Sequence, residues 1–186
     1  MVNSAFLSRL VCLSCLVLSS SQAAEHLPTT PAGTYEIRIC KTACSASDEE
    51  SVLIKGYVVL FATSLEKHEL ARFPSTSLRY LSDKSPNACF ALQKIPGRAY
   101  TGYAGIQSLG LTVWSVTGDE LKLMLMRSAD AGYRVSVRST ATGFEGEGTS
   151  WGAGVAAPPE LGPDAIVLRR IGESDIRRCE QILRDD

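Results

Sequence analysis

Short runs of apolar residues dominate the chain from residue 33 onward and predict β-strands. In residues 33–40, Tyr35, Ile37 and Ile39 alternate with other residues, which is typical of a strand with one buried face. Residues 52–61 are β-branched and aromatic at most positions, so we expect this strand to be covered on both faces. Further strands are predicted over residues 89–95, 109–117, 120–127, 132–139, 143–151 and 164–171.

The connections between the later strands are short. Gly118-Asp119 is a two-residue hairpin signal, and the next two turns, at residues 128–131 and 140–142, are also tight. Parallel neighbours would need crossovers of about a dozen residues, so these strands are expected to form an antiparallel meander. The predicted fold is all-β and mainly antiparallel: a small up-and-down β-barrel or β-sandwich of about eight strands with a short helical excursion and a C-terminal helix.

Residues 63–87 interrupt the β pattern. Residues 64–70 can form a short helix with Thr63 or Ser64 as its N-cap, and the rest of the segment is polar and irregular. We expect this excursion to cover one edge or end of the sheet.

The N-terminus has the three parts of a secretory signal peptide. A short polar start with Arg9 precedes an apolar run at residues 10–18, and small residues follow at Ser21 and Ala23. The run is too short to cross a bilayer, which takes about 20 residues, and no later segment is long and apolar enough to span a membrane. We therefore expect residues 1–23 to be removed and residues 24–186 to form one exported domain.

Four cysteines follow the signal peptide, which predicts two disulfides with three possible connectivities in an exported chain. Ser174 is expected to cap a C-terminal helix in which Ile176, Cys179 and Ile182 or Leu183 share the inward face. We favour Cys89 as the partner of Cys179, which leaves Cys40 with Cys44. The spacing of the cysteines and the two histidines does not predict a zinc site.

The charge balance argues against nucleic acid as a partner. The chain has 19 basic and 20 acidic residues, and the basic residues near the C-terminus alternate with acidic ones. No glycine-rich loop follows a strand and opens a helix, so no nucleotide cofactor is expected. The lack of N-glycosylation sequons favours a bacterial periplasm over secretion from a eukaryotic cell.

The segment Gly148-Thr149-Ser150-Trp151-Gly152 matches the nucleophile motif of α/β-hydrolases. The two prolines at 158–159 prevent a useful helix after it, and no histidine lies beyond His68 to act as the base. Two nearby carboxylates, Glu145 and Glu147, are spaced about 6–7 Å apart along one strand face, a distance compatible with a glycosidase pair. Alternating acidic residues are more typical of a solvated face. A hydrolase with a site at these residues is kept as an alternative.

Glycines alternate through residues 143–152, which either permits packing and curvature or leaves room for a ligand. Aromatic residues elsewhere could line a binding cavity with an arginine at its mouth, although aromatics in small barrels more often fill the core. The candidate ligand-binding residues are Tyr100, Tyr103, Trp114, Arg127, Ser150 and Trp151.

Gly33-Thr34-Tyr35 at the start of the first strand resembles the Gly-x-Trp opening of lipocalin and wider calycin barrels, with Tyr in place of Trp. This resemblance implies a cup for a small apolar or amphipathic molecule, or a rigid body that presents loops to another protein. We therefore expect a monomeric, exported, non-enzymatic binding protein without cofactor, periplasmic or secreted. An inhibitor-type module that binds another protein is the closest alternative.

Overall fold

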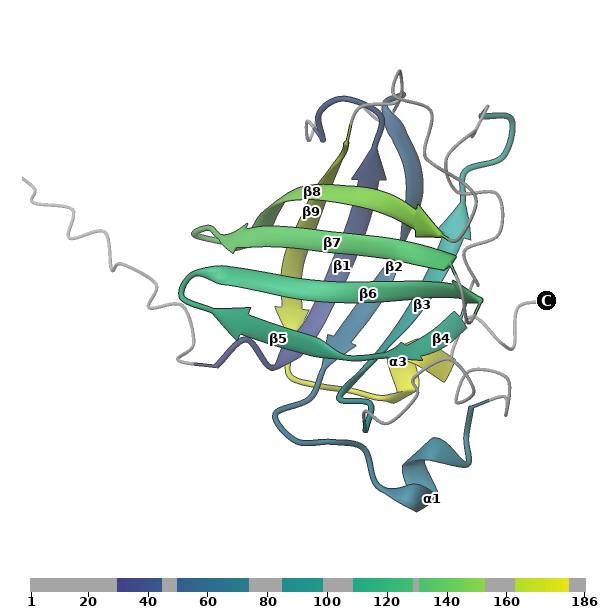
Figure 1. Ribbon diagram of the computed structural model, residues 1–186, viewed down its shortest axis with the longest axis vertical. Coiled ribbons are helices and arrows are strands. Elements are labelled where there is room, and N and C mark those ends of the chain that lie inside the picture. Colours follow the sequence, from purple (N-terminus) through teal and green to yellow (C-terminus); the bar gives the residue numbers. More distant parts are fainter. Residues whose placement is uncertain are drawn as a thin grey trace, which may run out of the picture.

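The computed structural model (Figure 1) describes residues 30–44, 50–73, 85–98, 109–128, 131–152 and 163–180, apart from the side chains of residues 126–128, 131 and 150–152. The expectations for residues 1–23, Tyr100, Tyr103, Ile182 and Leu183 lie outside these ranges.

The described residues form one antiparallel sheet of nine strands and two short helices. The strands are β1 Gly33–Cys40, β2 Val52–Leu60, β3 Ala88–Lys94, β4 Leu109–Thr112, β5 Trp114–Thr117, β6 Glu120–Ser128, β7 Ala131–Ser139, β8 Gly143–Gly152 and β9 Asp164–Gly172. The helices are α1 Lys67–Leu70 and α3 Arg177–Glu180.

The strand order β4-β3-β2-β1-β9-β8-β7-β6-β5 makes the sheet a nearly closed barrel. The first and last strands pair with each other, β1 against β9, and the two ends of the order, β4 and β5, are consecutive in the chain. In Figure 1, β5–β8 cross in front of β1, β2, β3 and β9. The expected all-β, antiparallel fold is confirmed, and of the two alternatives it is the barrel. The strands predicted from apolar periodicity are present within a few residues of their expected bounds, except that the one predicted over residues 109–117 is divided in two.

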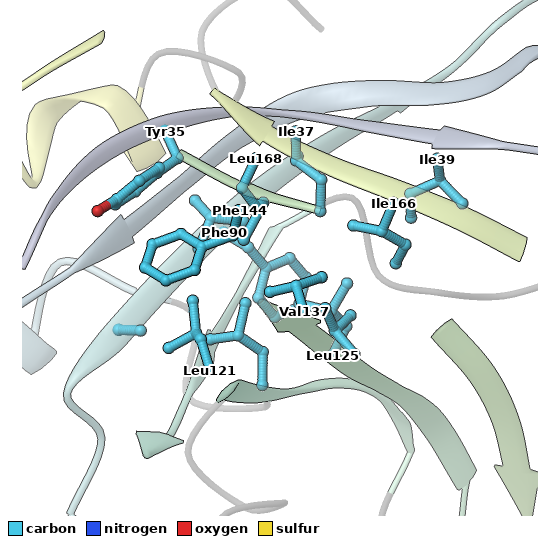
Figure 2. Close-up of a cluster of buried hydrophobic side chains, with 14 of the residues drawn as sticks. Tyr35, Ile37, Ile39, Phe90, Leu121, Leu125, Val137, Phe144, Ile166 and Leu168 are labelled. Carbon is cyan, nitrogen blue, oxygen red and sulfur yellow. The ribbon is translucent and has the colours of Figure 1, made fainter. Parts of the chain in front are cut away.

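The inside of the barrel is filled by the chain's own side chains. Alternate residues of each strand point inward, which follows from the period-two geometry of β-strands. Figure 2 shows this cluster, where side chains from β1 and β9 meet those from β6 and β7. The interior cluster consists of Tyr35, Ile37, Ile39, Ile54, Val58, Leu60, Ala88, Phe90, Leu92, Leu121, Leu123, Leu125, Tyr133, Val135, Val137, Phe144, Ile166 and Leu168.

Two glycines make room for aromatic rings in this packing. A Cβ on Gly148 would lie 2.2 Å from the Tyr133 ring, and one on Gly110 would lie 2.5 Å from the Phe90 ring. A Cβ on Gly146 would meet the backbone oxygen of Ser136 at 2.3 Å, so this glycine permits a close approach of two strands. The space left by these glycines of β8 is therefore occupied by neighbouring protein atoms.

A second apolar layer covers the outside of β2–β4. Outward-facing Val59 and Leu111 are buried beneath Leu65 and Phe73, which belong to the excursion around α1, and beneath Ile176 beside α3. The second strand is covered on its outer face only at Val59, because outward Lys55 is exposed. The excursion lies over the end of the sheet that β3 and β4 form, as expected.

The two disulfides are Cys40–Cys44, with Cα atoms 5.4 Å apart, and Cys89–Cys179, with Cα atoms 6.1 Å apart. The favoured connectivity is confirmed. Cys89 and Cys179 are both fully buried, and their bond fixes α3 to the outer face of β3. Both bonds are consistent with an oxidising, exported environment.

Two expectations about helix caps were wrong. The N-cap of α1 is Glu66, not Thr63 or Ser64, and a capping box joins Glu66 to Glu69. Ser174 does not cap α3, because its hydroxyl donates to the Leu60 carbonyl. The Asp175 carboxylate instead accepts from the backbone N–H of Arg177, the first residue of α3.

The predicted strand over residues 109–117 is divided at Val113 into β4 and β5. The division has a physical cause, because the two halves pair with different neighbours, β4 with β3 and β5 with β6.

Candidate functional site

The barrel closes at a seam around Val113. On one side of this residue β4 pairs with β3, and on the other side β5 pairs with β6. Side chains replace backbone hydrogen bonds at this point. Trp114 N–H donates to Asn87 Oδ1 at 2.8 Å, and Asn87 Nδ2 donates to the Trp114 carbonyl at 3.2 Å. The Thr112 hydroxyl donates to the carbonyl of Met124 in β6. The seam is therefore held by side-chain groups that imitate a strand ladder.

Trp114 ties the seam to the excursion. Its indole Nε1–H donates to the carbonyls of Phe61, at 3.0 Å, and Asn87, at 2.9 Å. Its ring is half-buried and packs against the interior cluster, while Val113 packs against the outer layer. Trp114 thus fixes the seam from the inner side of the barrel.

An open groove of about 810 Å³ begins at the seam and extends over the outer face of β5–β8. Apart from Leu123 and Val135, which belong to the interior cluster, the lining residues of β6–β8 are outward residues, so the groove lies outside the barrel. Its lining residues are Ser64, Ser85, Asn87, Val113, Trp114, Ser115, Glu120, Lys122, Leu123, Met124, Arg134, Val135, Ser136, Glu147 and Thr149. A volume of this size is within the range of small-molecule and peptide sites, about 300–1,000 Å³.

The groove combines an apolar part at the seam with a polar, charge-balanced remainder. Lys122 Nζ lies 3.0 Å from a Glu120 carboxylate oxygen, and the Ser136 hydroxyl donates to the same carboxylate. The Ser136 hydrogen bond first, and then the Lys122 ammonium, lower the pKa of Glu120 below its usual value. Glu120 is therefore ionised and paired at neutral pH, and the groove has no strong bias toward ligands of one charge.

Of the six candidate ligand-binding residues, the structure places Trp114 in the groove. Ser150 and Trp151 lie on the backbone of β8 and Arg127 on that of β6, but their side chains are outside the described part of the structure. The structure does not describe Tyr100 or Tyr103.

The residues considered for hydrolysis do not converge in the described structure. β8 continues through Gly152, so Ser150 lies within a strand and not on a strand-to-helix turn. Glu147 lines the groove but Glu145 is not among the lining residues. His68 is exposed on α1, with Nδ1 3.3 Å from the Glu66 carboxylate.

All four cysteines considered as metal ligands are in disulfides. Within the described ranges, no cluster of three or more His, Cys, Asp or Glu side chains could hold a metal ion. None of the described helices is long and apolar enough to cross a membrane.

Sequence reasoning missed Asn87, Thr112 and Met124 as residues of the site. Strand alternation places Met124 on the outer face of β6, so its position was accessible from the sequence. Asn87 stands in a polar segment before a strand, and nothing in its neighbourhood indicates that it pairs with a residue 27 positions later.

Comparison with known proteins assigns no family: no family model, no curated protein and no solved structure matches the chain. The lipocalin resemblance of Gly33-Thr34-Tyr35 therefore agrees with the barrel architecture and with nothing more specific.

Proposed function

We propose that this chain is an exported, non-enzymatic binding protein that holds an amphipathic partner in the groove over β5–β8. The observation that carries the proposal is the contrast between a filled barrel and an open groove. The side chains of the interior cluster occupy the inside of the barrel, while the groove on the outside has a volume of about 810 Å³. The partner is a small amphipathic molecule or a segment of another exported protein.

The chemistry of the groove supports an amphipathic partner. Val113, Trp114 and Met124 provide an apolar part at the seam, and hydroxyl, amide and paired charged groups surround it. Polar groups beside an apolar part of a site fix the orientation of a bound ligand. The Cys89–Cys179 disulfide and the seam hydrogen bonds hold the barrel rigid, which lowers the entropy lost on binding.

Export is part of the proposal, with the periplasm as the compartment. Two disulfides and an apolar N-terminal run support it. Expression of the full chain in a bacterium, followed by mass spectrometry of the periplasmic fraction, should detect a species without residues 1–23 and with both disulfides intact. An uncleaved, reduced chain in the cytoplasm would contradict this part of the proposal.

The groove is tested with anilinonaphthalene sulfonate, an amphipathic dye that fluoresces in apolar sites. The variant Thr149→Trp fills the groove from an exposed position on β8, and Glu145→Trp places the same side chain on the same strand face outside the groove lining. We expect Thr149→Trp to weaken dye binding by about tenfold, equivalent to about 1.4 kcal/mol. Glu145→Trp should bind the dye like the wild type. Absence of dye binding, or equal binding by both variants, would overturn the groove as the site.

A further inference from the structure

Among the residues that the structure describes, β5 has a strand neighbour on one side only. It pairs with β6 and stands at the end of the strand order. Thr117 and Glu120 close the two-residue hairpin, with Gly118 at φ +65°. In such a hairpin the closing pair exchanges backbone hydrogen bonds, and so does every second pair after it. Thr117 and Ser115 therefore bond to β6, while the backbone groups of Trp114 and Val116 point away from β6.

The contacts of Trp114 agree with this alternation. Its N–H and carbonyl both bond to the Asn87 side chain, the same exchange that a residue of a neighbouring strand would make. Val116 follows two residues later with the same orientation, and its N–H and carbonyl have no hydrogen-bond partner in the described part of the chain. The edge of β5 is therefore satisfied at Trp114 and open at Val116.

The open edge lies between two hollows. Trp114 and Ser115 line the groove, and Val116 lines a second hollow of about 310 Å³ at the end of the barrel. The apolar lining of this hollow includes Pro31 and the Tyr35 and Phe144 rings, whose centroids are 5.6 Å apart. The Val116 side chain is 41% exposed, which is unusual for a large apolar residue in this structure.

We propose that the edge of β5 accepts an extended segment of a partner protein as an added strand. A peptide backbone presents a donor and an acceptor at the spacing that Val116 requires, and alternate side chains of a strand point to opposite faces. One set would enter the hollow beside Tyr35 and Phe144, and the other would enter the groove. This inference rests on the proposed function, because it names the partner of the groove as an extended, alternately apolar segment of an exported protein.

The test uses linear peptides selected from a phage-displayed library on the full disulfide-bonded chain and then synthesised. Val116→Pro removes the open N–H but leaves the hydrogen bonds between β5 and β6, because the Val116 N–H does not face β6. Val116→Thr keeps the N–H and the β-branched shape, and serves as the matched control. We expect Val116→Pro to weaken peptide binding by about tenfold or more, and Val116→Thr to change it by less than about twofold.

A second measurement does not depend on how Val116→Pro folds. Each backbone amide of a selected peptide is N-methylated in turn, and binding to the wild-type chain is measured by fluorescence polarisation. Strand addition predicts loss of binding when one peptide amide is methylated, the amide that donates to the Val116 carbonyl, and little loss at the two neighbouring amides, which point away from β5. A scan in which no single amide is required, or in which neighbouring amides matter equally, overturns the inference.

The outcomes separate the inference from the proposed function. Peptides that are blocked by Thr149→Trp, but bind Val116→Pro normally and tolerate methylation of every backbone amide, overturn strand addition and leave the groove as a binding site. Failure to select any peptide whose binding is weakened by Val116→Pro also overturns strand addition. The dye experiment still tests the groove in that case. A wild-type dimer that Val116→Pro dissociates would assign the edge to a second copy and overturn the inference.

Discussion

The outer faces of the two halves of the barrel differ in what covers them. Over β2–β4, outward Val59 and Leu111 are buried under the excursion and α3, and the Cys89–Cys179 disulfide fixes this layer. Over β5–β8, Lys122, Arg134 and Glu147 alternate with the interior residues and line an open groove. Apolar outward residues require a cover because their exposure to water is unfavourable, whereas a polar face remains open for a partner. The covered face serves stability, and we assign binding to the open one.

Removal of the disulfide under the covered face should have the largest effect on the unfolding free energy. Cys89 and Cys179 are separated by 90 residues, and Cys40 and Cys44 by 4. Because the entropy of the unfolded chain depends on the length of the closed loop, Cys89→Ala with Cys179→Ala should cost about 4–5 kcal/mol of unfolding free energy. Cys40→Ala with Cys44→Ala should cost about 2 kcal/mol. Urea unfolding monitored by circular dichroism measures both, and equal losses would show that the covering layer does not depend on its disulfide.

Truncation of a large apolar residue should lower the unfolding free energy more on the covered face than on the open one. Phe73 is 5% exposed in the covering layer, so Phe73→Ala should lower the unfolding free energy by about 3 kcal/mol. Met124 is only half-buried in the groove, so Met124→Ala should cost about 0.5 kcal/mol. The same urea experiment compares them, and a larger loss for Met124 would mean that the open face contributes to the core.

The seam between the two faces should show an intermediate effect. Asn87→Ala leaves the Trp114 N–H and carbonyl without their partners, which should cost about 2 kcal/mol. Ser85→Ala changes a nearby groove residue that is exposed, and should be almost neutral. Thermal unfolding of the two variants measures the difference. Equal melting temperatures would indicate that water replaces the Asn87 amide at no cost.

The smallest expected effect is a pH dependence at Asp164, at the start of β9 beside β8. Burial raises the pKa of this carboxyl to about 6, against a smaller lowering by the Tyr133 hydroxyl, which lies 3.3 Å away. Because the folded pKa is above the unfolded value, the stabilising contribution is complete below about pH 4 and is lost as the pH rises through about 6. Half-exposure reduces the expected loss to about 1 kcal/mol.

Asp164→Asn should remove this dependence, since an amide does not titrate in the range. Unfolding free energies of the wild type and of Asp164→Asn at pH 4 and pH 7 provide the measurement. If the wild type gains stability relative to Asp164→Asn between these pH values, the direction of the pKa change at Asp164 is wrong.

The strands were accessible from the sequence because each depends on a local pattern. Tyr35, Ile37 and Ile39 alternate as a half-buried strand must, and Gly118 adopts the positive φ that a tight hairpin needs. The inward face of the last helix predicted that Cys179 is buried, but the sequence did not decide among the three connectivities, and the Cys89–Cys179 pairing was only favoured. The choice of barrel over sandwich was not accessible, because it depends on whether β1 pairs with β9 across most of the chain.

The groove was less predictable from the sequence than the strands, because it depends on contacts between distant segments. Periodicity places Lys122, Met124 and Arg134 on one face, but it does not show that this face is left uncovered. Val113 continues an apolar run in the sequence. The run is divided there because its first half pairs with β3 and its second half with β6. Asn87 and Trp114 meet because barrel closure brings distant segments together. The sequence by itself determined the strands, their inward faces and the expectation of two disulfides, since these depend on local periodicity and cysteine count. Closure alone determined the seam, the groove and the open edge at Val116, because each arises where the two ends of the sheet meet.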